Sequence, residues 1–341
     1  MGRKRFAFLD SMRGFAALWV VLFHLNVVGK FVPSTYQSFV SEGYLGVPIF
    51  FVLSGYAIHA SVLRVPSIPN FLKRRFFRIY PPYLASVALV IGIVIFEKIS
   101  TGTNDFITLP HELIEWLETL TLTTQPVTST NPINWVYWTL SYEAAFYLWL
   151  TIGLLAPRLR WPILFIPVIF SLFHHSFPVF FIDHWCLFAL GAAIAEWQQE
   201  KNPIAILLVI LCLLDAMLHR TVGETVAASV AFVLVMMAIS KRFNLLNREP
   251  ILHKVGTWSY SLYLIHVPIG VWLALKIDPF PRSLSIGNLP FHIAIDVYAL
   301  TVSCIFAYGF WHAIEKRSYE FALPHTVPAS THSAASEGHL T

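Results

Sequence analysis

The sequence predicts an all-α protein, a polytopic bundle of about ten transmembrane helices with the N- and C-termini in the cytoplasm. Composition is the first reason, because 56% of the 341 residues are hydrophobic and only 12% are charged, about half the charged share of a soluble domain. A single soluble core could not bury that much apolar surface. The other two reasons are the length of the apolar stretches and the placement of lysine and arginine.

The apolar stretches set the number of spans. A transmembrane helix needs about 20 mostly apolar residues, and ten such stretches can be placed in the sequence. The fifth is short and contains Pro162 and Pro167, so it is the weakest of them. The predicted spans are residues 9–28, 44–62, 81–97, 139–156, 161–174, 180–197, 203–219, 222–240, 257–275 and 292–313.

Lysine and arginine set the orientation, because cytoplasmic loops of membrane proteins carry an excess of both. With the N-terminus inside, the inner segments hold 17 of these residues and the outer segments hold 5, while Arg13 lies within the first span. An even number of spans returns the C-terminus to the cytoplasm, and Lys316 and Arg317 agree with that placement.

Two stretches lie outside the spans. The outer segment 98–138 is long and contains an amphipathic pattern near 111–120, and the sequence leaves open whether it is a solvated connection or a functional lid or acceptor-binding loop. Residues 320–341 are mostly polar and lack periodicity, which predicts a disordered cytoplasmic tail after a transmembrane domain at 1–319.

Ionisable residues inside a span are costly, so each one calls for a reason. Arg13 and His24 are eleven residues apart in the first span, which places them on one helix face about 16 Å apart. A cation at the cytoplasmic mouth and a neutral base further in would suit chemistry across the membrane. The alternatives are an interfacial anchor paired with Asp10 and a hydrogen-bonded packing histidine.

A basic cluster follows the second span on the predicted cytoplasmic side. Lys73, Arg74, Arg75 and Arg78 precede Pro81-Pro82, which we expect to open the third span. One possibility is that the cluster does no more than satisfy the positive-inside rule. The other is that it holds a phosphorylated cofactor, because arginine forks match phosphate geometry. In the second span, Ser54 precedes a glycine and could mark a bend or a cavity.

Two later spans add polar candidates. Glu143 is the only acid in the apolar run of the fourth span, where it follows Tyr142, and His266 lies midway along the ninth span. Glu143 could orient His24, act as a second acid or base, or pair with a cation. Two histidines and a carboxylate inside spans are more than packing usually demands.

Several motifs are absent from the sequence. It contains no Gly-rich phosphate loop ending in Lys-Ser/Thr, no dinucleotide fingerprint, no His-Glu-x-x-His zinc motif and no Gly-x-Ser-x-Gly nucleophile elbow. Metal sites normally need three or four convergent ligands. We therefore expect no bound metal. We also expect no nucleic-acid partner.

Five motifs in order resemble the membrane acyltransferase-3 family of polysaccharide and oligosaccharide O-acyltransferases. They are Arg13 with His24 after ten intervening residues, FFVLSGY at 50–56, RRFFRIYPP at 74–82, WTLSYEAAFYL at 138–148 and SYSLYLIHVPI at 259–269. IEKRSY at 314–319 resembles the closing element of the family, with Ser318 near the place of a common proline. The resemblance extends from about residue 8 to residue 318.

The resemblance implies an O-acetyltransferase of the bacterial cytoplasmic (inner) membrane. Such a protein takes an acyl group, usually acetyl, from cytoplasmic acetyl-CoA or another acyl-CoA. The acceptor is a hydroxyl of an extracytoplasmic carbohydrate or glycolipid, such as exopolysaccharide, O-antigen or lipo-oligosaccharide. Only a short tail follows Glu315, so we expect all transfer chemistry in the membrane domain.

The resemblance also implies roles for individual residues. His24 becomes the catalytic candidate, with Arg13 as its motif partner and Glu143 as support. Arg75 and Arg78, with Arg74 beside them, become candidates for the CoA phosphates. Further candidates in the matching motifs are His266, Ser54 and Tyr142.

A mechanism can be written for this hypothesis. A neutral His24 accepts the proton of the sugar hydroxyl, and the sequence leaves direct attack on the thioester and an acyl-histidine intermediate both open. The competing hypothesis is a transporter or flippase of a lipid-linked sugar, which would often show matching halves with paired broken helices. We find no such halves, and the sequence leaves the oligomeric state open.

Overall fold

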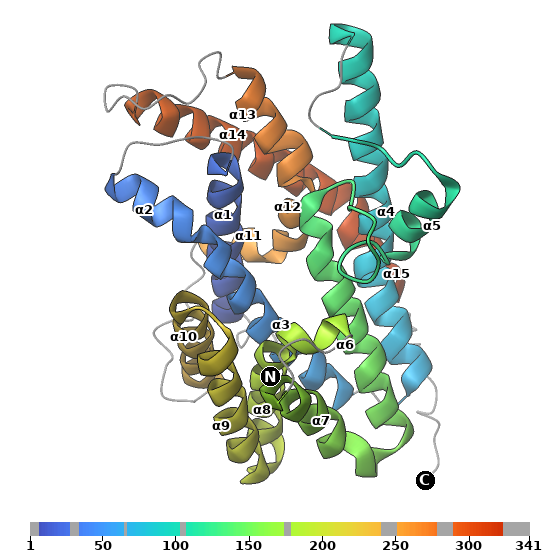
Figure 1. Ribbon diagram of the computed structural model, residues 1–341, viewed down its shortest axis with the longest axis vertical. Helices are drawn as coiled ribbons and strands as arrows, with labels where there is room; N and C mark the ends of the chain where they lie inside the picture. The colour runs from blue at the N-terminus through green and yellow to red at the C-terminus, as the bar shows by residue number, and fades with distance from the viewer. Residues whose placement is uncertain are drawn as a thin grey trace, which may run out of the picture.

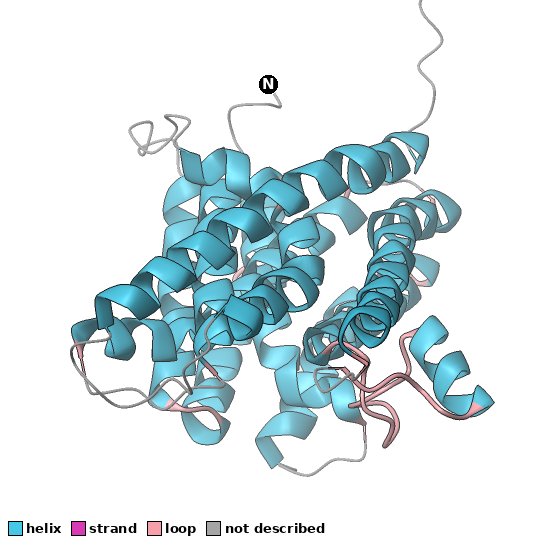
Figure 2. Cartoon of the chain, turned by 90° about the horizontal axis from the view of Figure 1, so that it is seen from above, coloured by secondary structure: helices cyan, strands magenta, loops and turns pink. Residues whose placement is uncertain are grey.

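The computed structural model describes residues 7–27, 34–64, 67–102, 107–173, 179–239, 251–277 and 289–322. Helices and loops make up this part of the chain, and no strand occurs within it (Figure 2). The all-α prediction is confirmed for these residues. Residues 323–341, most of the predicted tail, lie outside them, while residues 320–322 belong to the last helix.

A helix forms in each of the ten predicted spans, and shorter helices connect several of them (Figure 1). The span helices are α1 (Ala7–Asn26), α3 (Gly46–Val62), α4 (Ile68–Thr101), α6 (Trp138–Leu155), α7 (Arg160–Phe173), α8 (Trp185–Glu200), α9 (Ile204–His219), α10 (Val222–Ile239), α12 (Ser259–His266) continued by the π-helical segment η6 (Val267–Val271) and α13 (Trp272–Ile277), and α14 (Leu289–Phe310) continued by the π-helical segment η8 (Trp311–Glu315) and α15 (Lys316–Ala322). The shorter elements are α2 (Thr35–Ser41), η1 (Glu42–Leu45), α5 (Leu113–Thr121), η2 (Trp135–Tyr137), η3 (Pro157–Leu159), η4 (Phe180–His184) and α11 (Ile251–Thr257).

The helices are those of a multi-pass membrane protein. Within the described ranges, seven helical segments are long and apolar enough to cross a bilayer. Helices α7 and α9 are apolar but have only 14 and 16 residues, fewer than the roughly 20 that an upright span needs. The count of ten spans and the cytoplasmic position of both termini therefore stay predictions.

Helix α4 begins earlier than we predicted. It starts at Ile68, and Pro81 and Pro82 lie inside it rather than at its beginning. Proline cannot donate a backbone hydrogen bond, so Pro81 leaves the carbonyl of Phe77 without its helical partner. The hydroxyl of Ser318 on α15 donates to that carbonyl instead. A contact with the far end of the chain thus replaces the missing bond and lets the helix continue.

The segment between α4 and α6 is not a simple solvated connection. It contains α5 at the place where the sequence predicts an amphipathic helix, but its later part enters the bundle. The carbonyl of Thr119 accepts the Tyr83 hydroxyl at 2.5 Å, and the carbonyl of Leu122 accepts the Ser141 hydroxyl at 2.9 Å. Asn134 is 1% exposed. The interpretation of the segment as only a solvated connection is therefore wrong for residues 119–134.

Glycines let two pairs of helices approach closely. A Cβ atom on Gly256 of α11 would lie 1.7 Å from the carbonyl oxygen of Asp10 in α1, and one on Gly55 of α3 would lie 2.0 Å from the carbonyl oxygen of Phe188 in α8. No larger residue fits either position without a backbone shift. Close approach through small residues is a common way to associate helices in membranes, and here it fixes α1 and α3, which both face the cavity described below.

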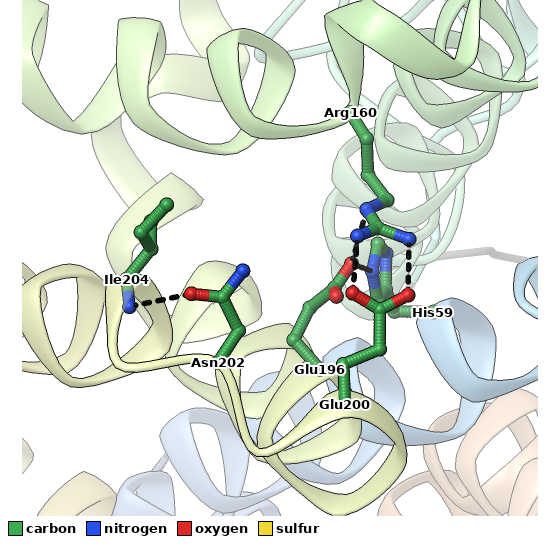
Figure 3. A network of polar contacts seen from close by, with 6 residues as sticks. All are labelled: His59, Arg160, Glu196, Glu200, Asn202 and Ile204. Carbon is green, nitrogen blue, oxygen red and sulfur yellow. Dashed lines mark hydrogen bonds and ion pairs between the residues drawn. The ribbon is translucent and has the colours of Figure 1, made fainter.

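A buried polar network joins α3, α7 and α8 (Figure 3). The Nε2 atom of His59 lies 2.7 Å from Oε1 of Glu196, and Nε of Arg160 lies 3.2 Å from the same oxygen. The two terminal nitrogens of Arg160 donate to the carboxylate of Glu200 at 3.0 and 2.7 Å. Glu196 is 0% exposed, so its charge depends on these partners.

Replacing Arg160 with methionine is expected to destabilise the bundle. The change keeps an apolar stem in place but leaves the buried Glu196 carboxylate with His59 as its remaining partner. Losing a hydrogen-bonded charge typically costs about 1.5–3 kcal/mol, less than for a fully buried ion pair because Arg160 is partly exposed. The effect is measured as the change in the free energy of unfolding of the purified protein in detergent, with unfolding monitored through the loss of helical circular dichroism. Arg158→Met is the matched control, because Arg158 is exposed two residues away. Equal stability of the two variants would contradict this role for Arg160.

Candidate active site

A cavity of about 770 Å³, including its open mouth, lies between α1, α3, α4, α6 and α12. Five of the predicted site residues line it. These are Arg13, Ser54, Arg75, Arg78 and Glu143. Residues from five separate helices therefore meet around one space, which is what a binding site for a long ligand requires.

One end of the cavity is cationic. Arg13 lies 3.7 Å from the carboxylate of Asp10, and the guanidinium of Arg75 lies over the rings of Phe71 and Tyr147 at 5.5 and 5.4 Å. Arg75 and Arg78 form no ion pair within 4 Å among the described residues, and Nε of Arg75 is buried without a hydrogen-bond partner there. Guanidinium groups with unused donors favour a phosphate or carboxylate ligand.

Two carboxylates complete the cationic end. Glu143 accepts a hydrogen bond from the Tyr147 hydroxyl. Glu315, which was not among the predicted site residues, is 4% exposed and accepts from the backbone and hydroxyl of Ser261 at 3.2 and 2.5 Å. Both carboxylates act electrostatically on Arg78. Neither carboxylate forms an ion pair with Arg78 within 4 Å in the described part of the chain.

One face of α3 forms the length of the cavity. Val47, Phe50, Ser54 and Ile58 line it at helical spacing, and the eleven helical steps from first to last cover about 16 Å. Gly43 packs against Trp19 and Phe23 of α1 and Gly46 packs against Ala16 and Val20. The two helices are therefore antiparallel here, and the Val47 end of the cavity is the end nearer to His24. The cavity therefore runs from the arginines toward His24.

His24 and His266 form a direct pair near that second end. Nδ1 of His24 lies 2.9 Å from Nε2 of His266, although the two residues are 242 positions apart. His266 is 0% exposed, and its Nδ1 atom lies 2.8 Å from the carbonyl oxygen of Tyr263 and 3.1 Å from that of Leu262. His24 is half-buried.

These contacts fix the tautomers of a neutral pair. Nδ1 of His266 faces carbonyl oxygens, which only accept, so it must carry the proton. Nε2 of His266 is then an acceptor, and Nδ1 of His24 must donate to it. This leaves the lone pair of His24 on Nε2, where it can take a proton or attack a carbonyl carbon. His24 is therefore oriented by the bond that it donates to His266 and by a hydrogen bond with the backbone of Val20, whereas Glu143 is bonded to Tyr147.

Tyr263 lies in the cavity lining and next to the histidine pair. Its ring lines the cavity, and the ring centre lies 5.9 Å from that of His266. Its hydroxyl donates to the carbonyl of Val136 at 2.8 Å and lies 2.8 Å from the hydroxyl of Thr139. Tyr263 belongs to the same late motif as His266, but sequence alone gave no sign of these contacts across the bundle.

Two predicted residues belong neither to the cavity lining nor to the histidine pair. Arg74 is on the neighbouring face of α4 and does not line it. Tyr142 is 5% exposed and packs with its ring 4.7 Å from that of His184 and 6.1 Å from that of Phe51. Neither residue lines the cavity or belongs to the histidine pair, and a role for either one stays a prediction.

Comparison with known proteins adds an independent finding. A family model described as "Acyltransferase domain", the acyltransferase-3 model, matches residues 6–308. This range contains Arg13, His24 and His266 together with the whole cationic end except Glu315. No solved structure was found to match the chain.

Curated relatives agree with the family match. YrhL of Bacillus subtilis, provisionally named a peptidoglycan O-acetyltransferase, is 26% identical over 90% of this chain and 54% of its own length. The acyltransferase MdmB of Streptomyces mycarofaciens is 31% identical over 41% of this chain and 37% of its own. The O-acetyltransferase OatA of Staphylococcus aureus is 32% identical over 26% of this chain and 14% of its own. The chain thus spans about half the length of YrhL and less of the other two.

Proposed function

The chain belongs to the acyltransferase-3 family, and from that membership we propose that it is a membrane O-acetyltransferase. The donor in this proposal is acetyl-CoA from the cytoplasm, and the acceptor is a hydroxyl of an extracytoplasmic carbohydrate. The single observation that supports it most is the His24–His266 pair beyond one end of a cavity whose other end holds three arginines. YrhL and OatA are named as O-acetyltransferases, which favours acetyl over longer acyl groups.

The cavity suits a coenzyme A thioester in both charge and length. Arg13, Arg75 and Arg78 offer the CoA phosphates a cationic mouth. The face of α3 that lines the cavity, about 16 Å long in all, is mostly apolar, and the hydroxyl of Ser54 lies along it. The pantetheine arm would follow this face and bring the thioester toward His24.

The transfer step uses the lone pair on His24 Nε2. As the acceptor hydroxyl oxygen attacks the thioester carbonyl carbon, Nε2 takes the hydroxyl proton. The new C–O bond forms, the C–S bond breaks, and the CoA thiolate leaves and recovers the proton from His24. The same lone pair could instead attack the thioester first and form an acyl-histidine. Both routes need His266 to hold the proton of His24 on Nδ1.

Replacing Arg78 with glutamine is expected to raise KM for acetyl-CoA about tenfold, with a smaller change in kcat. A charge-assisted hydrogen bond to a phosphate contributes about 1.5–3 kcal/mol, and 1.4 kcal/mol corresponds to about tenfold in affinity. Initial rates at varied acetyl-CoA, measured on purified protein in lipid nanodiscs, check this. Arg74→Gln is the matched control on the same helix but outside the cavity, and an equal shift in both variants would contradict the assignment.

The proposed function as a whole is tested in the host. Surface and secreted glycans are analysed for ester-linked acetyl groups in a strain lacking the gene and in the same strain restored with the wild type. Loss of an O-acetyl signal on deletion and its return with the wild type are expected. Unchanged esters together with a lipid-linked sugar that accumulates inside the cell would favour a transporter and overturn the proposal.

A further inference from the structure

Trp135 lies directly beside the proposed base. It is the first residue of η2 and is 39% exposed. Its ring centre lies 6.3 Å from that of His24, and the two ring planes are inclined by 40°. An aromatic residue of this size usually gains most from burial. With 39% of its surface exposed beside a catalytic candidate, the indole is accessible to a bound acceptor.

The backbone around Trp135 is fastened to the helix that carries His266. Nδ2 of Asn134 donates to the carbonyl of Leu264 at 3.0 Å, and the carbonyl of Val136 accepts the Tyr263 hydroxyl at 2.8 Å. Leu264 and Tyr263 are the second and third residues before His266. The residues on both sides of Trp135 are thus tied to α12, so the indole keeps a fixed position relative to the histidine pair.

We propose that the indole of Trp135 is the platform on which one sugar ring of the acceptor lies, so that a hydroxyl of that ring reaches His24. This inference rests on the proposed function and names its acceptor more closely, as a pyranose with an apolar face. The face of an aromatic ring is electron-rich, and the C–H groups on one face of a pyranose are weakly positive. Stacking orients the ring while its hydroxyls stay available for reaction.

The alternative role for Trp135 is an interfacial anchor, because tryptophan is enriched at membrane surfaces. An anchor needs contact with lipid headgroups and no fixed relation to a base. The bonds of Asn134 and Val136 to the His266 helix are what an anchor would not require. They favour the platform.

The test compares acceptors with and without a sugar ring. Unacetylated surface glycan is prepared from the deletion strain and used as acceptor, and glycerol serves as a hydroxyl acceptor that has no ring. With Trp135→Ala, KM for the glycan is expected to rise about tenfold, the size of an aromatic contact. Transfer to glycerol and KM for acetyl-CoA are expected to stay within about twofold of the wild type. Trp135→Phe should recover most of the glycan affinity.

Trp116→Ala is the control for removal of a half-buried tryptophan from the same segment, on α5, and it should leave both reactions unchanged. An unchanged KM for the glycan in Trp135→Ala would overturn the platform, as would an equal loss with glycan and glycerol. A rise in KM for acetyl-CoA would place the indole on the donor path and also overturn it. If the wild type itself transfers no acetyl group to the glycan, the proposed function fails instead.

Discussion

Replacement of His24 by alanine is expected to lower acetyl transfer by about a hundredfold to ten-thousandfold, the usual contribution of a positioned general base. The variant removes the only ring nitrogen that the pairing with His266 leaves with an available lone pair. It leaves the arginine end intact, so binding of acetyl-CoA should persist with a similar Kd. Transfer of labelled acetyl from acetyl-CoA to the unacetylated glycan, measured at saturating donor, gives the rate.

A control separates loss of the base from loss of the fold. His312→Ala removes an exposed histidine in η8 and should keep the wild-type rate. The His24→Ala protein should unfold in detergent at the wild-type temperature to within about two degrees, since a half-buried side chain contributes little to a chain of this size. A variant that folds, binds acetyl-CoA and still transfers acetyl at the normal rate would place the base elsewhere, with Glu143 as the next candidate.

Replacement of His266 by phenylalanine is expected to lower kcat by about ten- to a hundredfold, the range seen when the group that orients a functional histidine is lost. Phenylalanine fills a similar volume but offers Nδ1 of His24 no acceptor. The proton of His24 is then free to reside on Nε2, where it blocks the lone pair needed for transfer. KM for acetyl-CoA should not change, because His266 does not line the cavity.

Glutamine at position 266 distinguishes an orienting role from a packing role. Its side-chain oxygen can take the place of Nε2 as an acceptor, so His266→Gln should recover part of the rate that His266→Phe loses. If both variants lose the same activity, His266 serves packing alone. If both keep the full rate, the tautomer of His24 is set by another group. The pH profile of kcat gives a further readout, because a change of packing alone would leave its shape unaltered.

Local patterns in the sequence were enough to predict the helical spans and the arrangement of Arg13 and His24 on one helix. Both depend on periodicity within a single segment. The pairing of His24 with His266 depends on how α1 and α12 pack, and no local pattern contains that information. The same holds for α4, whose passage through Pro81 depends on Ser318.

Motif membership does not say which residues line the cavity, and Arg74 and Tyr142 are each turned by about 100°, the angle between neighbours on a helix, from an adjacent residue that does line it. Glu143, Thr139 and Leu140 share the face of α6 that lines the cavity, and Tyr142, next to Glu143, points into a different aromatic cluster. Arg74 is displaced from Arg75 in the same way. Helical periodicity could have excluded both residues once one residue of the cavity face was known, but which face turns inward is a property of the bundle.

The hydrogen bond between Ser318 and the Phe77 carbonyl has a mechanical consequence. Because Pro81 and Pro82 have no backbone N–H, α4 lacks two backbone hydrogen bonds close to Arg78. Such a pair of missing bonds would ordinarily make a hinge. The Ser318 hydroxyl of α15 replaces one of these bonds by donating to the Phe77 carbonyl. The stiffness of the part of α4 that carries Arg75 and Arg78 therefore depends on α15, near the other end of the sequence. Any change that detaches α15 would let these two arginines move relative to Arg13 and His24 on α1.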